Sequence, residues 1–186
     1  MNRTGIIVEG DSDKEILKVI IDKLGKKEEN FRFSVAGGKT DLLKKLEKQH
    51  INYLVRMQHC NKIIILPDYD NFNDQSKKII KTAEEIKERR KDASIELCFA
   101  TQEIESWLLG CYEEVLKEAK NEEPDNVEDP VALLEKHERK IRKDKNFRYN
   151  KISDGKRIAQ NNELKHFEHS ASFKRFEKIL QKFNNN

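Results

Sequence analysis

Short apolar runs alternate along this chain with longer segments whose apolar residues recur every three or four positions. The runs predict four strands, over 6–8, 31–35, 63–66 and 95–100. The segments between them predict helices, over about 12–24, 42–46 and 79–86. A strand–helix alternation of this kind predicts an α/β protein with a mainly parallel four-stranded sheet and helices on both faces.

Local signals set the expected helix ends. Ser12, with Glu15 three residues later, has the pattern of a capping box, and Gly25 is typical of a helix stop. Ser76 is a candidate cap for the third helix. Ile51 to Val55 either extends the second helix or starts another one.

The second part of the chain has a different character. Residues 119–130 are acidic and contain two prolines, which predicts a loop. Asp129 then predicts a helix cap, with Pro130 at the first helical position. We therefore expect a core over 1–118 and a helical, basic extension over 119–186 packed on it.

Composition narrows the class of protein. The 186 residues, 22.0 kDa in mass, suit one domain with an extension. No apolar stretch is long enough for a membrane span or a signal peptide, so we expect no membrane partner. The three cysteines are widely spaced, which favours a reduced, cytoplasmic protein over a disulfide framework.

The net charge of +3 conceals two opposed populations. Residues 133–186 hold 15 basic and 7 acidic side chains, a net of +8, and the remainder holds 22 and 27, a net of −5. A basic extension on an acidic core favours a polyanionic partner such as nucleic acid, although an ordinary solvated surface accounts for the same counts.

Carboxylates gather where the predicted strands end. Because the carboxyl ends of parallel strands meet at one edge of a sheet, they would repel one another there unless a cation neutralised them. Oxygen ligands alone suit Mg²⁺ or Mn²⁺. Helix capping and turn formation are the alternative explanation, above all for Asp11 and Asp13. The acids in question are Glu9, Asp11, Asp13, Asp68, Asp70, Glu103 and Glu105.

The motifs resemble a known family. Residues 7–10 (Ile-Val-Glu-Gly) with Asp13, followed by Leu-Pro-Asp-Tyr-Asp at 66–70, resemble the TOPRIM domain of topoisomerases, primases and OLD-family nucleases. Glu-Ile-Glu-Ser-Trp-Leu at 103–108 and Ser-Ala-Ser-Phe at 170–173, together with Tyr149-x-Lys151, resemble the small TOPRIM-like family DUF4276.

This resemblance implies roles for six carboxylates. Glu9, Asp68 and Asp70 would be catalytic and bind metal, with Asp68 and Asp70 as the Mg²⁺-binding pair. The remaining ligands would be Asp13, Glu103 and Glu105. Many TOPRIM domains carry a third acid where this chain has Phe72, which favours a nuclease over a topoisomerase or a primase.

Basic residues offer a candidate nucleic-acid surface. The stretch from 139 to 157 is rich in lysine and arginine, interleaved with Phe147 and Tyr149 as stacking aromatics would be. A solvated helical face is the alternative. Gly37-Gly38-Lys39-Thr40 lacks the first glycine of a P-loop, which leaves Lys39 as a possible phosphate contact. The candidate nucleic-acid-binding residues are Lys39, Arg139, Arg142, Lys143, Arg148 and Lys151.

The sequence thus favours a Mg²⁺- or Mn²⁺-dependent nuclease acting on DNA or RNA. The alternative is a non-catalytic subunit that binds nucleic acid or a separate ATPase, possibly in phage defence. A receiver-like phosphotransfer domain is less favoured, because no lysine ends the strand that finishes at Ala100. Trp107 is expected in the core beneath Glu103 and Glu105.

Overall fold

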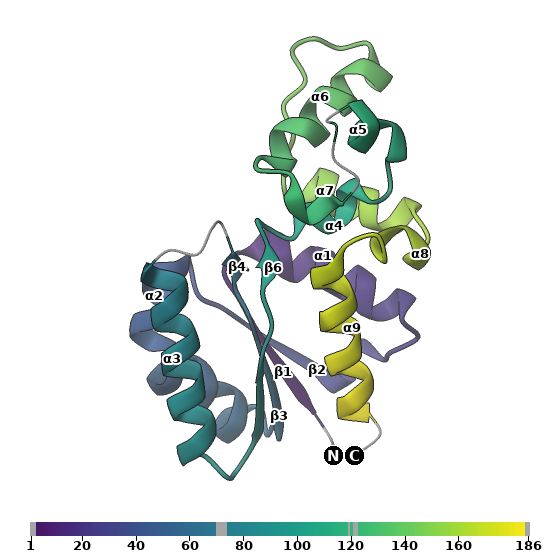
Figure 1. Ribbon diagram of the computed structural model, residues 1–186. Helices are drawn as coiled ribbons and strands as arrows, with labels where there is room; N and C mark the ends of the chain where they lie inside the picture. The colour runs from purple at the N-terminus through teal and green to yellow at the C-terminus, as the bar shows by residue number, and fades with distance from the viewer. Residues whose placement is uncertain (1–2, 70–73, 119, 121–122, 185–186) are drawn as a thin grey trace.

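The computed structural model describes residues 3–69, 74–118, 120 and 123–184. Its centre is a parallel four-stranded sheet with the strand order β2-β1-β3-β5 (Figure 1). The strands are β1 (Thr4–Val8), β2 (Phe31–Val35), β3 (Lys62–Leu66) and β5 (Ser94–Leu97). This confirms the predicted α/β class and the parallel sheet.

Helices flank the sheet on both faces and continue beyond its carboxyl edge (Figure 1). The first half of the chain contributes α1 (Asp11–Lys23), η1 (Glu28–Asn30), α2 (Lys39–Lys45), η2 (Leu46–Ile51), η3 (Tyr53–Met57) and α3 (Asp74–Arg89). The second half contributes α4 (Glu105–Leu109), α5 (Glu113–Glu118), η4 (Pro124–Asn126), α6 (Pro130–Arg142), α7 (Ser153–Asn161), α8 (Leu164–Phe167) and α9 (Ala171–Asn184).

Alternation along the central strands separates two hydrophobic cores. Ile6 and Val8 of β1 face a core formed with α1, α4 and α9, whereas Ile7 faces a core formed with α2 and α3. Side chains of a strand point alternately to opposite faces, so a continuous apolar run indicates a strand covered on both sides. The first core includes residues on both sides of position 119, and the proposed division at 118 remains a prediction.

The predicted fourth strand is interrupted. After β5 the chain continues as β6 (Ala100–Thr101), which pairs in parallel with β4 (Asp68–Tyr69) beyond the end of β3. Pro67 and the 98–99 step separate these short strands from the main sheet. The β4–β6 pair therefore extends the sheet past its carboxyl edge and carries Asp68 outward with it.

The segment after α2 neither extends that helix regularly nor starts another α-helix. η2 and η3 are π-helical, and Leu46, Ile51 and Leu54 are buried in the second core. A π-helix widens the turn by one residue, which alters the usual 3.6-residue spacing of the buried side chains.

Two predicted helix ends are wrong and two are confirmed. Helix α1 begins at Asp11, and the carboxylate that accepts the amide of its N-cap residue, Gly10, is that of Asp13 rather than Glu15. Ser76 lies buried inside α3 and does not cap it. Gly25, at φ 68°, ends α1, and the Asp129 side chain caps α6 by accepting a hydrogen bond from the Ala132 amide at 2.8 Å.

The described helices also bear on the expected lack of a membrane partner. None of them, within the described ranges, combines the length and the apolar character that crossing a bilayer requires.

Candidate carboxylate site

Five of the predicted acids lie at the carboxyl edge of the sheet. They come from the residue after β1, the first turn of α1, the start of β4, the short link between β6 and α4, and the first residue of α4. Gln102, at φ 62°, lies in the left-handed region that non-glycine residues seldom adopt, and it turns the chain from β6 into that link. The five acids are Glu9, Asp13, Asp68, Glu103 and Glu105.

Glu9 connects three strand ends. Its Oε1 accepts a hydrogen bond from the Asp68 amide at 3.1 Å, which ties β1 to β4. Its carbonyl oxygen accepts the amides of Gly37 and Gly38, at 2.9 and 3.2 Å, from the loop after β2. The backbone therefore fixes the position of this carboxylate.

Asp13 has a structural task as well as a place in the cluster. Its Oδ2 accepts the Gly10 amide at 2.8 Å, and Ser12 Oγ donates to its Oδ1 at 3.3 Å. Burial outweighs these hydrogen bonds and raises the pKa of Asp13 above its ordinary value. The capping explanation for this acid is thus confirmed, and it does not exclude a second role.

Asp68 is held in a strongly unfavourable electrostatic environment. Burial first, and then the charges of Asp13 and Glu9, raise the pKa of Asp68 well above its ordinary value. The side chain keeps partial access to solvent. A carboxylate that resists ionisation in this way is stabilised by any cation that comes within contact distance.

Glu105 is the most deeply buried member. Its side chain is 1% exposed, and neither carboxylate oxygen has a hydrogen-bond partner among the described residues. Burial first, and then the charge of Glu103, raise the pKa of Glu105 to about 8. Burying a carboxylate without a hydrogen-bond partner costs on the order of 1–3 kcal/mol or more. The Glu105 carboxylate therefore indicates a partner that is not among the described residues.

Tyr149 lies near the same group. Its hydroxyl is buried without a partner among the described residues, and burial followed by the charge of Glu105 raises the pKa of Tyr149. Glu105 and Tyr149 therefore place two unsatisfied polar groups at the inner end of the cluster.

Lys151 supplies one positive charge to the cluster. Its ammonium forms an ion pair with Glu103. Burial lowers the pKa of Lys151, but the charges of Glu105 and Glu103 outweigh this and raise it. The side chain is 45% exposed, so it closes the outer side of the cluster without sealing it.

A hydrogen-bonded loop delivers Tyr149 and Lys151. Residues 143–152 connect α6 to α7, and the Glu135 carboxylate accepts the Tyr149 amide at 2.8 Å. Asp154 accepts the Asn150 amide at 2.9 Å at the other end of the loop. These clips hold the loop across the carboxylate site.

The support beneath Glu105 is a buried polar network. Trp107 is fully buried, as predicted, and its Nε1 donates to Ser172 Oγ at 2.7 Å. Asp125 accepts the Ser172 amide at 2.7 Å and the Ser170 hydroxyl at 2.6 Å, and Ser170 Oγ accepts the Phe173 amide at the start of α9. The Ser-x-Ser-Phe motif therefore anchors α9 to α4.

Most of the predicted nucleic-acid contacts are engaged within the chain. Arg139 and Arg148 pair with Glu135, the latter at 3.2 Å. Arg142 pairs with Glu138 at 2.9 Å, which couples successive turns of α6. These side chains stabilise α6 and the loop after it, and are not arranged as a row of unpaired charges.

Two further candidates are Lys143 and Lys39. Lys143 ends α6 at φ 53° and is exposed, with no ion pair among the described residues. Lys39 starts α2 after Gly38 and is half-buried.

The donor chemistry fits a hard divalent cation, because the converging side chains offer oxygens and those of Glu105 have no partner in the described part of the chain. Among the described residues, however, no three acidic, histidine or cysteine side chains close into a metal-ligating group. Asp70, the remaining predicted ligand, and Phe72 lie outside the described residues.

A cavity of about 360 Å³ opens onto the site. Asp68 and Glu103 line it together with Gln102, Asp129, Pro130 and Glu128. Sequence reasoning missed Glu128, since it lies in a segment read only as an acidic loop. The available signal was its place in the sequence, directly before Asp129, the predicted cap of α6, which lines the same cavity.

Fold and site together define a class: a parallel α/β protein whose sheet edge presents buried, mutually repelling carboxylates. Comparison with family models identifies the family. Residues 8–181 match the model described as "Domain of unknown function (DUF4276)", so the chain belongs to the DUF4276 family. Comparison with curated proteins gives no match, and neither does comparison with solved structures. The wider TOPRIM resemblance remains a prediction.

Proposed function

We propose that this protein is a cytoplasmic, Mg²⁺- or Mn²⁺-dependent nuclease that cleaves phosphodiester bonds of DNA or RNA at a TOPRIM-like carboxylate site. One observation carries the proposal. Among the residues that the structure describes, the two buried oxygens of Glu105 have no hydrogen-bond partner, and the charges of Asp13 and Glu103 act on them, an arrangement that a divalent cation would stabilise.

The chemistry assigns a task to each group. A bound divalent ion would neutralise the phosphate, activate a water and stabilise the leaving oxygen. Asp68 and Glu105, with Asp70, would hold that ion. Glu9, held by the Asp68 amide, would take up the proton of the attacking water. Lys151 would place its ammonium beside the phosphate.

The test is cleavage of labelled DNA and RNA, in single- and double-stranded form, with Mn²⁺. Glu9→Gln keeps an oxygen that can accept the Asp68 amide but removes the charge and the proton acceptor. Loss of a general base slows cleavage by about 100-fold or more. Glu88→Gln, on the exposed side of α3, should cleave like the wild type. Equal cleavage by Glu9→Gln and the wild type, with both folded, would refute the proposal.

A second candidate is favoured by the Glu103–Lys151 ion pair. A lysine at the outer side of the cluster partly neutralises it, as a protein that binds no metal would require. On this account the chain is a non-catalytic subunit that binds nucleic acid or a separate ATPase. Arg139, Arg142 and Arg148, which are engaged within the chain, then serve its structure rather than a substrate.

A further inference from the structure

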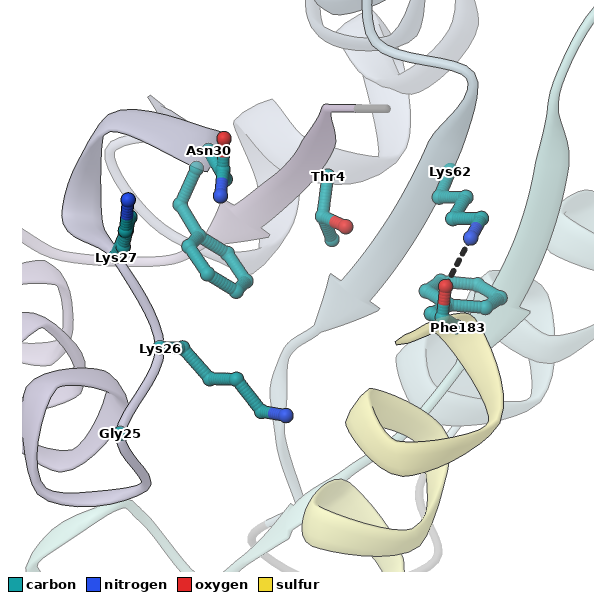
Figure 2. A pocket seen from close by; sticks show the side chains of 8 residues that line it. Thr4, Gly25, Lys26, Lys27, Asn30, Lys62 and Phe183 are labelled. Carbon is teal, nitrogen blue, oxygen red and sulfur yellow. Dashed lines mark hydrogen bonds between the residues drawn. The ribbon is translucent and has the colours of Figure 1, made fainter. Parts of the chain in front are cut away.

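A second cavity, of about 350 Å³, lies at the opposite edge of the sheet from the carboxylates (Figure 2). It is bounded by the first residues of β1, β2 and β3, the turn after α1 and the end of α9, and it shares no lining residue with the acidic cavity. Its lining residues are Thr4, Gly25, Lys26, Lys27, Asn30, Phe31, Lys62 and Phe183.

The charge of this cavity has one sign. Three lysines line it, and none of its eight lining residues is acidic. Lys26 and Lys27 form no ion pair within the part of the chain that the structure describes. This distinguishes them from Arg139, Arg142 and Arg148, which are paired with carboxylates.

Lys62 strengthens the argument because it is buried. Its residue is 7% exposed, and its ammonium donates to the Phe183 carbonyl in the last turn of α9. The Phe183 ring lies 5.9 Å below the same ammonium. The end of a helix carries roughly half a negative charge, which is too little to balance three lysines. Among the described residues Lys62 has no carboxylate partner. A buried ammonium without one is costly, so an anion in this cavity would stabilise it.

Neutral donors lie next to these charges. Thr4 and Lys62 are register partners on the adjacent parallel strands β1 and β3, so they occupy the same level of the sheet. Figure 2 shows the Lys26 side chain extending from the turn after Gly25 toward α9, with Asn30 and Thr4 on the other side of the cavity. Ammonium, hydroxyl and amide groups together are the donors that bind oxyanions.

We propose that this cavity binds the phosphate group of a small phosphorylated molecule, with Lys26 and Lys62 as the charged donors and Thr4 and Asn30 as the neutral ones. The proposal is independent of the nuclease function, because the two cavities lie at opposite edges of the sheet and share no residue.

The test is a calorimetric titration of the full chain with inorganic phosphate, pyrophosphate and a nucleoside monophosphate, with ionic strength held constant by chloride. The test variant is Lys26→Gln, since Lys26 is partly exposed and its loss should not unfold the protein. Removing one charge-assisted hydrogen bond should weaken binding by about tenfold or more. Lys48→Gln, an exposed lysine away from the cavity, is the matched control and should bind like the wild type.

Three outcomes would overturn the proposal. The first is the absence of any phosphate-dependent heat above the chloride control. The second is an equal loss of affinity in Lys26→Gln and Lys48→Gln, which indicates diffuse attraction. The third is binding of a single-stranded oligonucleotide without binding of the small phosphates, which indicates a nucleic-acid backbone as the source of the phosphate.

Discussion

At the scale of single residues, the site is defined by unsatisfied burial. Glu105 has no hydrogen-bond partner within the described residues, Asp13 is shared between a helix cap and the cluster, and Glu103 is paired with Lys151. Each of these carboxylates contributes to the local negative potential. The Glu103–Lys151 pair relieves only part of it, because Asp68 and Glu105 still have raised pKa values.

This predicts how stability depends on pH. The pKa of Glu105 rises from 4.5 to about 8 on folding, so the folded protein binds its proton more tightly than the unfolded chain does. Without divalent cations, the free energy of unfolding should therefore fall as pH rises from about 5 to 8. Glu105→Gln should show a shallower fall and gain on the order of 2–4 kcal/mol over the wild type by pH 8 relative to pH 5.

Urea unfolding at several pH values, in the presence of a chelator, measures this effect. Glu88→Gln on the exposed side of α3 should follow the wild-type curve. An identical pH slope in Glu105→Gln and the wild type would show that Glu105 carries no raised pKa.

At the scale of elements, α9 and α4 are joined by a polar network rather than by packing alone. Ser172 Oγ accepts from Trp107 Nε1 at 2.7 Å and donates to Asp125 at 3.2 Å. The ring of Trp107 packs against Phe173 and Phe176 of α9. These hydrogen bonds fix the position of α4 relative to α9, and with it the position of Glu105, the first residue of α4.

Ser172→Ala should therefore destabilise the protein by about 2–4 kcal/mol, because it leaves the buried Trp107 N–H without an acceptor and removes a bond to Asp125. Equilibrium urea unfolding measures the loss. Ser153→Ala, at the exposed start of α7, should change stability by less than about 0.5 kcal/mol. A loss as small for Ser172→Ala as for Ser153→Ala would mean that packing alone positions α9.

The periodicity of the sequence was sufficient to predict the central strands, but not the β4–β6 extension or the helical segments around the sheet. The apolar runs at 6–8 and 63–66 predict strands because burial on both faces leaves no polar position. The π-helical turns of η2 and η3 bury Leu46, Ile51 and Leu54 in the second core, and such tertiary packing is not encoded in local patterns. The Asp13 cap is local, since it joins residues three apart, and the Ser12–Glu15 pattern predicted the wrong pair for it. The Ser-x-Ser-Phe motif was recognised in the sequence, but its role in binding Trp107 and Asp125 was not predicted.

At the scale of the whole molecule, the two edges of one sheet carry opposite charge. The carboxyl edge gathers buried acids beneath the loop between α6 and α7, and the amino edge gathers Lys26, Lys27 and Lys62 around a cavity. Arginines of residues 133–186 pair with Glu135, Glu138 and Asp154 of the same segment, so these pairs leave its net charge of +8 unchanged. The total of +3 therefore conceals two separations of charge. One lies along the chain, between its acidic first part and its basic second part, and the other lies between the two ends of the strands.

The most direct test of the central claim is calorimetric titration of the protein with Mn²⁺, using the wild type, Asp68→Asn, Lys151→Met and the exposed control Asp22→Asn. The account predicts binding by the wild type and by Asp22→Asn, and binding weakened about tenfold or more in Asp68→Asn. It predicts tighter binding in Lys151→Met, because no ammonium then competes for Glu103. Absence of Mn²⁺ binding by both the wild type and Lys151→Met would contradict it and favour the non-catalytic subunit.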